Sequence, residues 1–464
     1  MIAKDRPWAL VAASAAALVA GLVRIPGALH DAMWQDEVAS ARVISETGPL
    51  GVIRQIARTE STPPLWYALG WIAHRAGAGV QDVRFLSVAA GMALAGAVVV
   101  CARQLVPLPA ATAAGVGVAL GYQFVFHGRE LRAYELAALL TVVLAVAAER
   151  LAAEPTRGRS AQLACAVALG TLTHYFVVLS VVAVAIWLAT IPGVVRRRGA
   201  AALATGVVPL ALWTPIALRQ YEQHRFSFIG PFSLRGAVMT YWLLFARGQP
   251  RTGVLHVAAP AALLLAVAAG AALLARASLL GRLWALLAVT PVGLGLVVWL
   301  AGVRIYDVRN LIAAGPFAAV AVAALVARLP RPTAAVACAG LCCLLMLGYV
   351  RSDRVRPVAY DRIAEALVAE GWRQGDPIVV YAEPNALWGP LEWYLPGQPR
   401  FVALRAAAGA APAFVVAARG PRWGRVIRDA VATRTVWSLL VARVRPGERW
   451  PGATVFVSQK AVQR

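Results

Sequence analysis

The chain of 464 residues is 60% hydrophobic and only 14% charged, and its mean hydropathy is +0.67. This composition excludes a soluble domain of that length and predicts a polytopic membrane protein. The net charge of +23 comes almost entirely from arginine. Because these arginines are spread along loops without a basic tract or a stacking platform, we do not expect a nucleic-acid partner.

Ten apolar runs define the predicted membrane part, residues 1–350. Most of them match the roughly 20 residues that cross a hydrocarbon layer of about 30 Å as a helix. The runs are Trp8–Val23, Phe85–Ala102, Leu105–Phe126, Ala133–Ala148, Ala161–Val195, Gly199–Leu218, Val254–Ala275, Leu283–Val303, Leu311–Ala327 and Thr333–Val350. The first run resembles a signal peptide, but no cleavage site with a soluble chain follows it, so we expect a retained span.

The run from Ala161 to Val195 would form a helix of about 52 Å, far longer than the bilayer is thick. A break near Thr173–Tyr175 would divide it into two spans. It would also keep the arginines that flank both ends on one side of the membrane, as the positive-inside rule requires. We therefore predict about eleven transmembrane helices, with the amino terminus inside and the carboxyl terminus outside.

Asp36 and Glu37 follow the first span in the segment MWQDEVASAR. Adjacent carboxylates are costly in lipid, so we expect them in a watery cleft at the membrane surface, where ionisable groups generally serve chemistry or transport. The same outer segment carries TESTPPLWYALGWIAHRAG, in which Pro63–Pro64 stops an incoming helix and an aromatic, apolar face predicts a juxtamembrane helix. A plain connector is the alternative.

Polar residues gather again at FHGRELRAYEL, from Phe126 to Leu136. An ion-paired helix cap is one explanation, and a phosphate-gripping site is the sharper hypothesis, because a guanidinium can hold phosphate through two parallel hydrogen bonds. Arginines on the outer side suit an anionic lipid head group. They are Arg42, Arg54, Arg58, Arg84, Arg129, Arg132, Arg219, Arg225, Arg304 and Arg309. His174 and Tyr175, at the predicted turn, could hydrogen-bond a sugar or phosphate, although a lone His there is more often structural.

After Val350 the pattern changes, and residues 351–464 predict a small extracytoplasmic α/β domain. Helical spacing covers Asp361–Trp372 and Arg425–Arg434, whereas Pro377–Glu383, Phe414–Arg419, Leu439–Val444 and Thr454–Gln459 have the pattern of strands. Asn385–Gly397 is as consistent with packing as with binding substrate. The five cysteines all fall inside predicted spans, so we expect packing residues and no disulfide-bridged ectodomain.

The order of these motifs resembles the GT-C glycosyltransferases of the protein-mannosyltransferase and lipid A aminoarabinose-transferase type, glycosyltransferase family 39. WQDE after the first span, then TPPLWY, VQDVRFLS, ELRAYEL, THYF and VRNLIAAGP carry the resemblance over residues 1–350. Each motif is short, and their order and sidedness are what is specific. Where the family has Arg-Tyr before its late span, this chain has Arg309–Asn310.

The resemblance implies transfer of a sugar, such as mannose or another hexose or pentose, from a polyprenyl-phosphate lipid to a glycan, lipid or protein acceptor. The transfer would invert the anomeric configuration and occur at the extracytoplasmic face of the cell membrane. The resemblance places the catalytic carboxylate at Asp36, with Glu37 beside it, and donor-phosphate binding at Arg132, Arg129, Arg309 and His174. Tyr134, Tyr175 and Glu60 are expected to contact the substrate. No cofactor is predicted, and one acidic pair is too little to predict a metal site.

Two other functions fit parts of the pattern. A transporter or flippase of a lipid-linked phosphate would also have many spans and arginines at the membrane edge. It should show an internal repeat and helices broken near mid-membrane, whereas here the charged residues gather at one face. An inactive relative that acts through its outer domain as an assembly or binding protein is the third possibility. Sugar transfer by an Asp36→Asn variant separates these functions.

Overall fold

The computed structural model describes residues 6–223, 229–246, 255–352, 360–369, 371–381, 390–397, 399–402, 413–418 and 453–458. The chain forms two compact units. The first consists of Met1–Leu29 and Val43–Arg351, and the second of His30–Arg42 and Ser352–Arg464. The segment His30–Arg42, which the sequence places in the membrane part, thus groups with the carboxyl-terminal residues.

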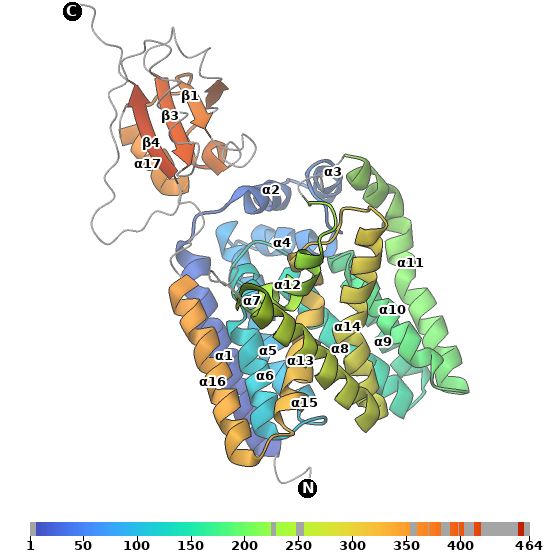
Figure 1. The fold of residues 1–464 in the computed structure, drawn as a ribbon. Helices are drawn as coiled ribbons and strands as arrows, with labels where there is room; N and C mark the ends of the chain where they lie inside the picture. The colour runs from blue at the N-terminus through green and yellow to red at the C-terminus, as the bar shows by residue number, and fades with distance from the viewer. Residues whose placement is uncertain are drawn as a thin grey trace, which may run out of the picture. The chain divides into compact units, whose positions relative to one another are not determined.

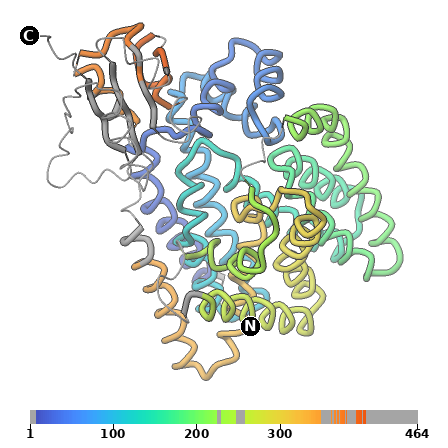
Figure 2. Tube along the Cα trace, turned by 45° about the horizontal axis from the view of Figure 1, so that its top comes forward, coloured from blue at the N-terminus to red at the C-terminus, as the bar shows by residue number. Residues whose placement is uncertain are grey.

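The first unit is built of α-helices joined by turns (Figure 1). In chain order they are α1 (Arg6–His30), α3 (Pro49–Thr59), α4 (Leu65–Arg75), α5 (Arg84–Ala102), α6 (Leu108–Leu120), α7 (Tyr122–His127), α8 (Tyr134–Ala153), α9 (Arg157–Thr173), α10 (Val177–Ala189), α11 (Val194–Glu222), α12 (Leu234–Phe245), α13 (Leu255–Ala277), α14 (Leu279–Leu300), α15 (Gly315–Val326) and α16 (Arg331–Ser352). The 3₁₀ turns η1 (Gln81–Val83) and η2 (Val308–Ala314) precede α5 and α15. Both views show α16 alongside α1 (Figure 1 and Figure 2), and Leu345 packs against Val23 and Leu120.

Seven helices in the described part of the chain are long and apolar enough to cross a membrane. They are Pro7–His30, Gln81–Ala102, Tyr134–Ala153, Val194–Glu222, Val257–Ala277, Leu279–Leu300 and Val308–Val326. The shorter apolar helices Leu108–Leu120, Val177–Ala189 and Arg331–Leu347 accompany them. The chain is therefore an α-helical, multi-pass membrane protein, as its composition predicts.

Two of the predicted apolar runs are interrupted. The run Ala161–Val195 breaks where predicted, because the backbone of His174 is extended (φ −154°, ψ 130°) and ends α9. The run Leu105–Phe126 was predicted as one continuous helix, and the structure divides it into two. Gly121 (φ −59°, ψ 135°) separates α6 from α7, and a Cβ at this position would lie 2.9 Å from the carbonyl oxygen of Gly117. Apolar composition alone does not reveal such a break.

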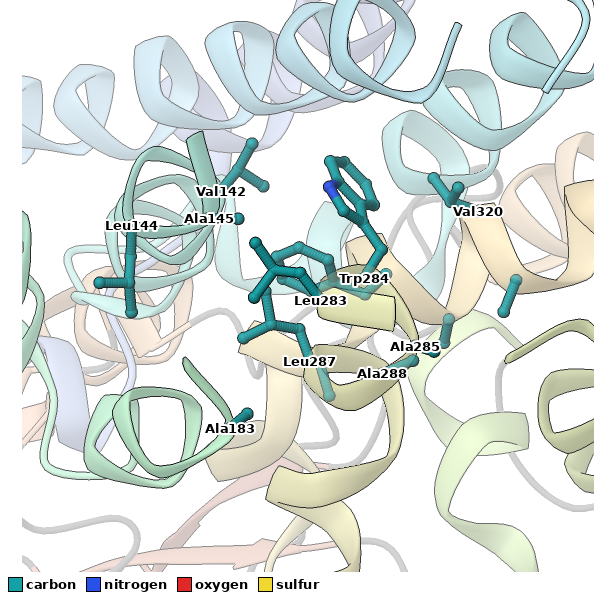
Figure 3. Packing of buried hydrophobic residues seen from close by; sticks show 14 of the residues in the cluster. Val142, Leu144, Ala145, Ala183, Leu283, Trp284, Ala285, Leu287, Ala288 and Val320 are labelled. Atoms are coloured by element: carbon teal, nitrogen blue, oxygen red, sulfur yellow. The ribbon is translucent and has the colours of Figure 1, made fainter. Parts of the chain in front are cut away.

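Part of the core of the first unit is shown in Figure 3, where side chains of α8, α10, α14 and α15 pack together. Leu283, Trp284 and Leu287 of α14 are fully or almost fully buried, and the Trp284 ring meets the Phe317 ring edge-on with 4.9 Å between centroids. Many of the neighbouring residues are alanines, whose small side chains allow the helices to approach closely. Within a bilayer the hydrophobic effect does not drive helices together, and close packing of this kind stabilises their association instead.

Helices α1 and α8 are joined by a buried ion pair. Arg24 of α1 lies 3.4 Å from Glu135 of α8, and both side chains are 0% exposed. Arg24 also donates to the carbonyl oxygen of Ala119 at 2.8 Å. Two glycines make room for this side chain: a Cβ on Gly128 would overlap Arg24 Nε, and a Cβ on Gly91 would lie 2.7 Å from it. The sequence does not reveal this pair, because Arg24 there resembles an ordinary charge that flanks a span.

The second unit contains α2 (Gln35–Ile44, whose last two residues belong to the first unit), α17 (Tyr360–Ala369) and a four-stranded sheet. The strand order is β2 (Arg400–Val402), β1 (Pro377–Tyr381), β3 (Ala413–Ala418) and β4 (Ala453–Ser458). Strand β1 pairs in parallel with β2 and β3, and β3 pairs antiparallel with β4. The predicted strands at residues 377–383, 414–419 and 454–459 match β1, β3 and β4, and the predicted helix at residues 361–372 matches α17. The three-residue strand β2 was not predicted. The helix predicted at residues 425–434 and the strand at residues 439–444 lie outside the described residues.

Candidate functional site

The nine residues that the sequence predicts for the site are divided between the two units. Asp36 and Glu37 lie in the second unit. The first unit holds the other seven, which are Glu60, Arg129, Arg132, Tyr134, His174, Tyr175 and Arg309. The meeting of the two groups in one pocket therefore stays a prediction.

The two carboxylates of the acidic pair have different surroundings. Glu37 lies in the first turn of α2, and its Oε2 accepts the backbone N–H of Trp34 at 3.4 Å. A carboxylate that reaches back in this way forms half of a capping box and is favourable at the positive end of a helix. Glu37 is 1% exposed, whereas Asp36 is only partly buried. Asp36 is therefore the more accessible of the two to a reactant.

Glu60 and Arg132 form a buried ion pair in the first unit. Arg132 Nη1 lies 2.9 Å from Glu60 Oε2, and the side chains are 7% and 2% exposed. The Tyr67 hydroxyl donates to the same oxygen over 2.5 Å, and Thr62 Oγ1 lies 2.6 Å from that hydroxyl. Burial first, and then the charge of Glu60, raises the pKa of Tyr67 well above its ordinary value, so the phenol keeps its proton and donates. This network fixes the position of the Arg132 guanidinium.

The TESTPPLWY motif folds so as to create the network. Helix α3 ends at Thr59, and Glu60 is extended (φ −102°, ψ 160°). Pro63 and Pro64 cannot continue a helix, so the chain turns before α4 begins. The first turn of α4 then carries Tyr67 back to Glu60. The expected helix after the two prolines is confirmed as α4.

Helix α5 anchors the main chain on the other side of the network. The Ser87 hydroxyl is completely buried and lies 2.7 Å from the carbonyl oxygen of Glu130 and 3.1 Å from that of Arg132. The turn between α7 and α8 is therefore tied to a membrane helix at two points. Arg132 is held through both its backbone and its side chain.

A row of rings lies beside this turn. The His127 ring is 4.2 Å from the Tyr134 ring, and Tyr134 is 5.3 Å from His174, centroid to centroid. His127 Nδ1 lies 2.9 Å from Glu130 Oε2. Burial lowers the pKa of His127 well below its ordinary value, and the positive charges of Arg309 and Arg132 lower it further. Since a neutral imidazole must donate to a carboxylate, Nδ1 carries the proton.

His174 is a neutral hydrogen-bond donor. Burial, followed by the charges of Arg132 and Arg309, lowers its pKa to about 3. Its Nδ1 accepts the backbone N–H of Phe176 at 3.3 Å, so the ring proton is on Nε2. Nε2 is buried and has no acceptor among the described residues. A buried N–H without an acceptor is uncommon in folded proteins, and a water molecule or a ligand usually supplies the acceptor.

The two remaining arginines flank this group. Arg309 follows the Asp307 cap of η2, its side chain is 21% exposed, and its charge acts on both His127 and His174. Arg129 lies over the Phe126 ring at 6.0 Å. The positive charges of Arg132 and Arg309 therefore both act on His174, and the three residues come from separate parts of the chain.

Tyr175 belongs to a different network. Its hydroxyl donates to Gln220 at 2.7 Å and accepts the indole N–H of Trp213 at 2.9 Å. Burial raises the pKa of Tyr175 to about 12. These bonds tie the start of α10 to α11, which is a packing role.

Tyr67 and His127 also belong to this group of residues, although the sequence motifs did not point to them. His127 and Glu130 are three residues apart at a predicted helix end, and that spacing is a usable signal for a side-chain hydrogen bond. Tyr67 gave no such signal, because its contact with Glu60 depends on the turn at the two prolines. Among the described residues, no three His, Cys, Asp or Glu side chains gather as they would around a metal ion. Chemically, a guanidinium and a neutral imidazole N–H are each suited to a phosphate oxygen.

Three solved structures resemble the chain along almost its whole length. ArnT from Cupriavidus metallidurans in the apo state is 12% identical, with a TM-score of 0.58 and 98% of each chain covered. The same protein bound to undecaprenyl phosphate gives 12% identity and a TM-score of 0.56, with 97% of this chain and 98% of that one covered. Arabinofuranosyltransferase AftD from Mycobacteria is 15% identical, with a TM-score of 0.50, over 98% of this chain and 42% of that one.

These similarities show a GT-C-like fold, as the motif order implied. No protein-family model matches the sequence, and no curated protein matches it by sequence.

Proposed function

We propose that this chain, whose fold is GT-C-like, is an integral-membrane glycosyltransferase that moves a sugar from a polyprenyl-phosphate donor to an acceptor. The observation that carries the proposal is the neutral His174 N–H beside the charges of Arg132 and Arg309. ArnT, which resembles the chain in fold, has been solved with undecaprenyl phosphate bound. A lipid phosphate is therefore the ligand that we assign to these donors.

The proposed roles follow from the contacts. Arg132 binds the donor phosphate, and His174 Nε2 donates a hydrogen bond to one of the phosphate oxygens. Arg309 and Arg129 add positive charge at the rim. Glu60 acts through Arg132, whose guanidinium it orients, and Tyr134 contacts the sugar or the phosphate from the row of rings.

The reaction is a single displacement. Asp36 takes the proton of the acceptor hydroxyl as that oxygen forms a bond to the anomeric carbon. The bond between this carbon and the phosphate oxygen breaks, and its electron pair stays on the lipid phosphate, where the guanidiniums stabilise the growing charge. One displacement inverts the anomeric configuration and requires no second nucleophilic carboxylate. Glu37 supports Asp36 by capping α2.

We place the reaction at the extracytoplasmic face of the cell membrane. The support is the distribution of arginine: Arg150, Arg157, Arg159 and the run Arg196–Arg198 flank the ends of α8 to α11 opposite the His174 turn. Basic residues of this kind mark the cytoplasmic side. The His174 turn then lies on the outer side.

The lipid-binding half of the proposal is tested with undecaprenyl phosphate and the full chain in lipid nanodiscs. Arg132→Gln should weaken binding at least about tenfold, since a charged hydrogen bond is lost. Arg276→Gln, an exposed arginine at the end of α13, is the matched control and should bind as the wild type does. Equal affinities for both variants would remove the phosphate role of Arg132.

The catalytic half is tested in cells that lack the protein, by profiling extracted lipids. Wild type should prevent the accumulation of one polyprenyl-phosphate sugar, and Asp36→Asn should not, while it still binds undecaprenyl phosphate. Clearance of the donor by Asp36→Asn at the wild-type rate would remove the base role. Movement of the lipid across a vesicle bilayer without sugar transfer would favour a transporter.

A further inference from the structure

The segment that carries Asp36 belongs to the same compact unit as the carboxyl-terminal residues. His30–Arg42 groups with Ser352–Arg464, although more than three hundred residues separate them in the chain.

Two contacts join this segment to one short stretch near the carboxyl terminus. The Tyr394 hydroxyl accepts the backbone N–H of Met33 at 2.7 Å. Glu392, two residues earlier, pairs with Arg42 at 2.5 Å. Both residues lie in NALWGPLEWYLPG, the stretch whose role the sequence left open between packing and substrate binding.

The two contacts lie on either side of the acidic pair. Met33 precedes Asp36 by three residues, and Arg42 lies in the last turn of α2. Met33 is 3% exposed, so its N–H would have no hydrogen bond from water and needs a protein acceptor. Tyr394 provides that acceptor. The N–H is held just before Trp34, the residue at which Glu37 caps the helix.

The two contacts constrain α2 to different degrees. Arg42 and Glu392 are 42% and 47% exposed, and exposed ion pairs contribute little to stability. The Tyr394 bond is partly buried and involves the main chain, so it constrains the path of the backbone into α2. Tyr394 is therefore the principal contact, and Glu392 is secondary.

We infer that the carboxyl-terminal part of the second unit positions the catalytic acid. Tyr394 accepts the N–H of Met33, and this bond fixes the start of α2 and with it the conformation of the chain at Asp36. Tyr394 is a positioning residue and does not touch the substrate. This inference rests on the proposed function for the role of Asp36. It assigns the unit a task in catalysis rather than in substrate recognition.

Hydrogen exchange of the full chain in nanodiscs tests the structural half, independently of activity. Tyr394→Phe should speed exchange at Met33 roughly fivefold or more, the factor expected from one lost hydrogen bond. The matched control is Trp372→Phe, which removes a bond of the same kind in the same unit, from Trp372 Nε1 to the carbonyl oxygen of Asp376. The control should leave exchange at Met33 unchanged. Unchanged exchange at Met33 in Tyr394→Phe would overturn the inference.

Donor clearance and lipid binding test the functional half. Tyr394→Phe should lower the transfer rate at saturating donor by about the same factor, with undecaprenyl phosphate affinity unchanged. Faster exchange with an unchanged transfer rate would also overturn the inference. If Asp36→Asn retains transfer, the proposed function fails instead, and the exchange result still decides whether the contact exists.

A second pair of variants tests the secondary contact between Glu392 and Arg42. Glu392→Arg places like charges together and should speed exchange in Ser40–Ile44. The double variant Glu392→Arg with Arg42→Glu should restore the wild-type exchange rate. Equal exchange in the single and double variants would show that these two residues do not hold α2.

Discussion

Arg132 and Glu60 are 72 residues apart in sequence and 2.9 Å apart in space, in an ion pair that Tyr67 completes. The pair links the end of α3 to the start of α8. It leaves one guanidinium oriented by the protein before any ligand arrives. Such preorganisation makes electrostatic stabilisation of a transition state effective.

Tyr67→Phe should destabilise the protein by about 1–3 kcal/mol, because Glu60 loses a buried donor. It should also weaken undecaprenyl phosphate binding, since Arg132 is then held less firmly. Thermal unfolding in detergent and lipid binding are the measurements. Tyr221→Phe is the control, because Tyr221 is 49% exposed. Equal losses in the two variants would contradict a special role for the Tyr67 hydroxyl.

Gly128→Ala should be strongly destabilising. The added Cβ would overlap Arg24 Nε and lie 2.6 Å from the carbonyl oxygen of Phe124, which cannot move out of the way. Overpacking of this kind costs about 1–3 kcal/mol. Gly293→Ala in α14 is the matched control, because nothing lies within 4 Å of its Cβ. The midpoints of thermal unfolding of the two variants should differ, and a Gly128→Ala protein as stable as Gly293→Ala would disprove the close packing around Arg24.

His174 should make stability depend on pH below neutrality. Its pKa is about 3 in the folded protein, whereas an unperturbed histidine titrates near 6.5. Between these values the unfolded chain binds the extra proton, so stability is lost as the pH falls through this window. The loss approaches about 1.4 kcal/mol per pH unit.

His174→Asn tests this dependence, because asparagine can still accept the N–H of Phe176 but does not titrate. The stability difference between wild type and variant should shrink by about 2 kcal/mol between pH 7.5 and pH 5. Chemical unfolding at the two pH values measures it. A constant difference would mean that His174 keeps an ordinary pKa in the folded protein.

The Arg24–Glu135 pair should show strong coupling in a double-mutant cycle. Glu135→Gln alone leaves a buried charge without its partner, which costs about 3–5 kcal/mol. Arg24→Met together with Glu135→Gln removes both charges, so its loss should be smaller than the sum of the two single losses. Additive losses, measured by unfolding, would show that the two side chains do not interact.

Much of the fold could be predicted because the bilayer sets the length of an apolar helix. The positive-inside rule also located the break at His174. The interruption at Gly121 could not be predicted, since a single glycine in an apolar run is compatible with a continuous helix. Strand β2 has three residues and no distinct pattern.

The sequence predicted which residues belong to the site better than it predicted their contacts. Arg132, Arg309 and His174 were predicted from motif order, and in the structure the charges of both arginines act on His174. The hydroxyl of Tyr67 was missed because the rotation of α4 about its own axis decides what it touches. Tyr175, although adjacent to His174, faces α11, because neighbouring residues at a helix start point in different directions.

The fit of Arg24 between Gly91 and Gly128 has a consequence for how this sequence can change. A larger residue at either glycine meets the guanidinium, and a shorter residue at Arg24 leaves Glu135 without its cation. The four positions therefore constrain one another and cannot drift independently. Among natural variants of the chain they should covary, with a neutral residue at position 24 accompanied by a neutral residue at position 135 and by bulkier residues at the two glycines.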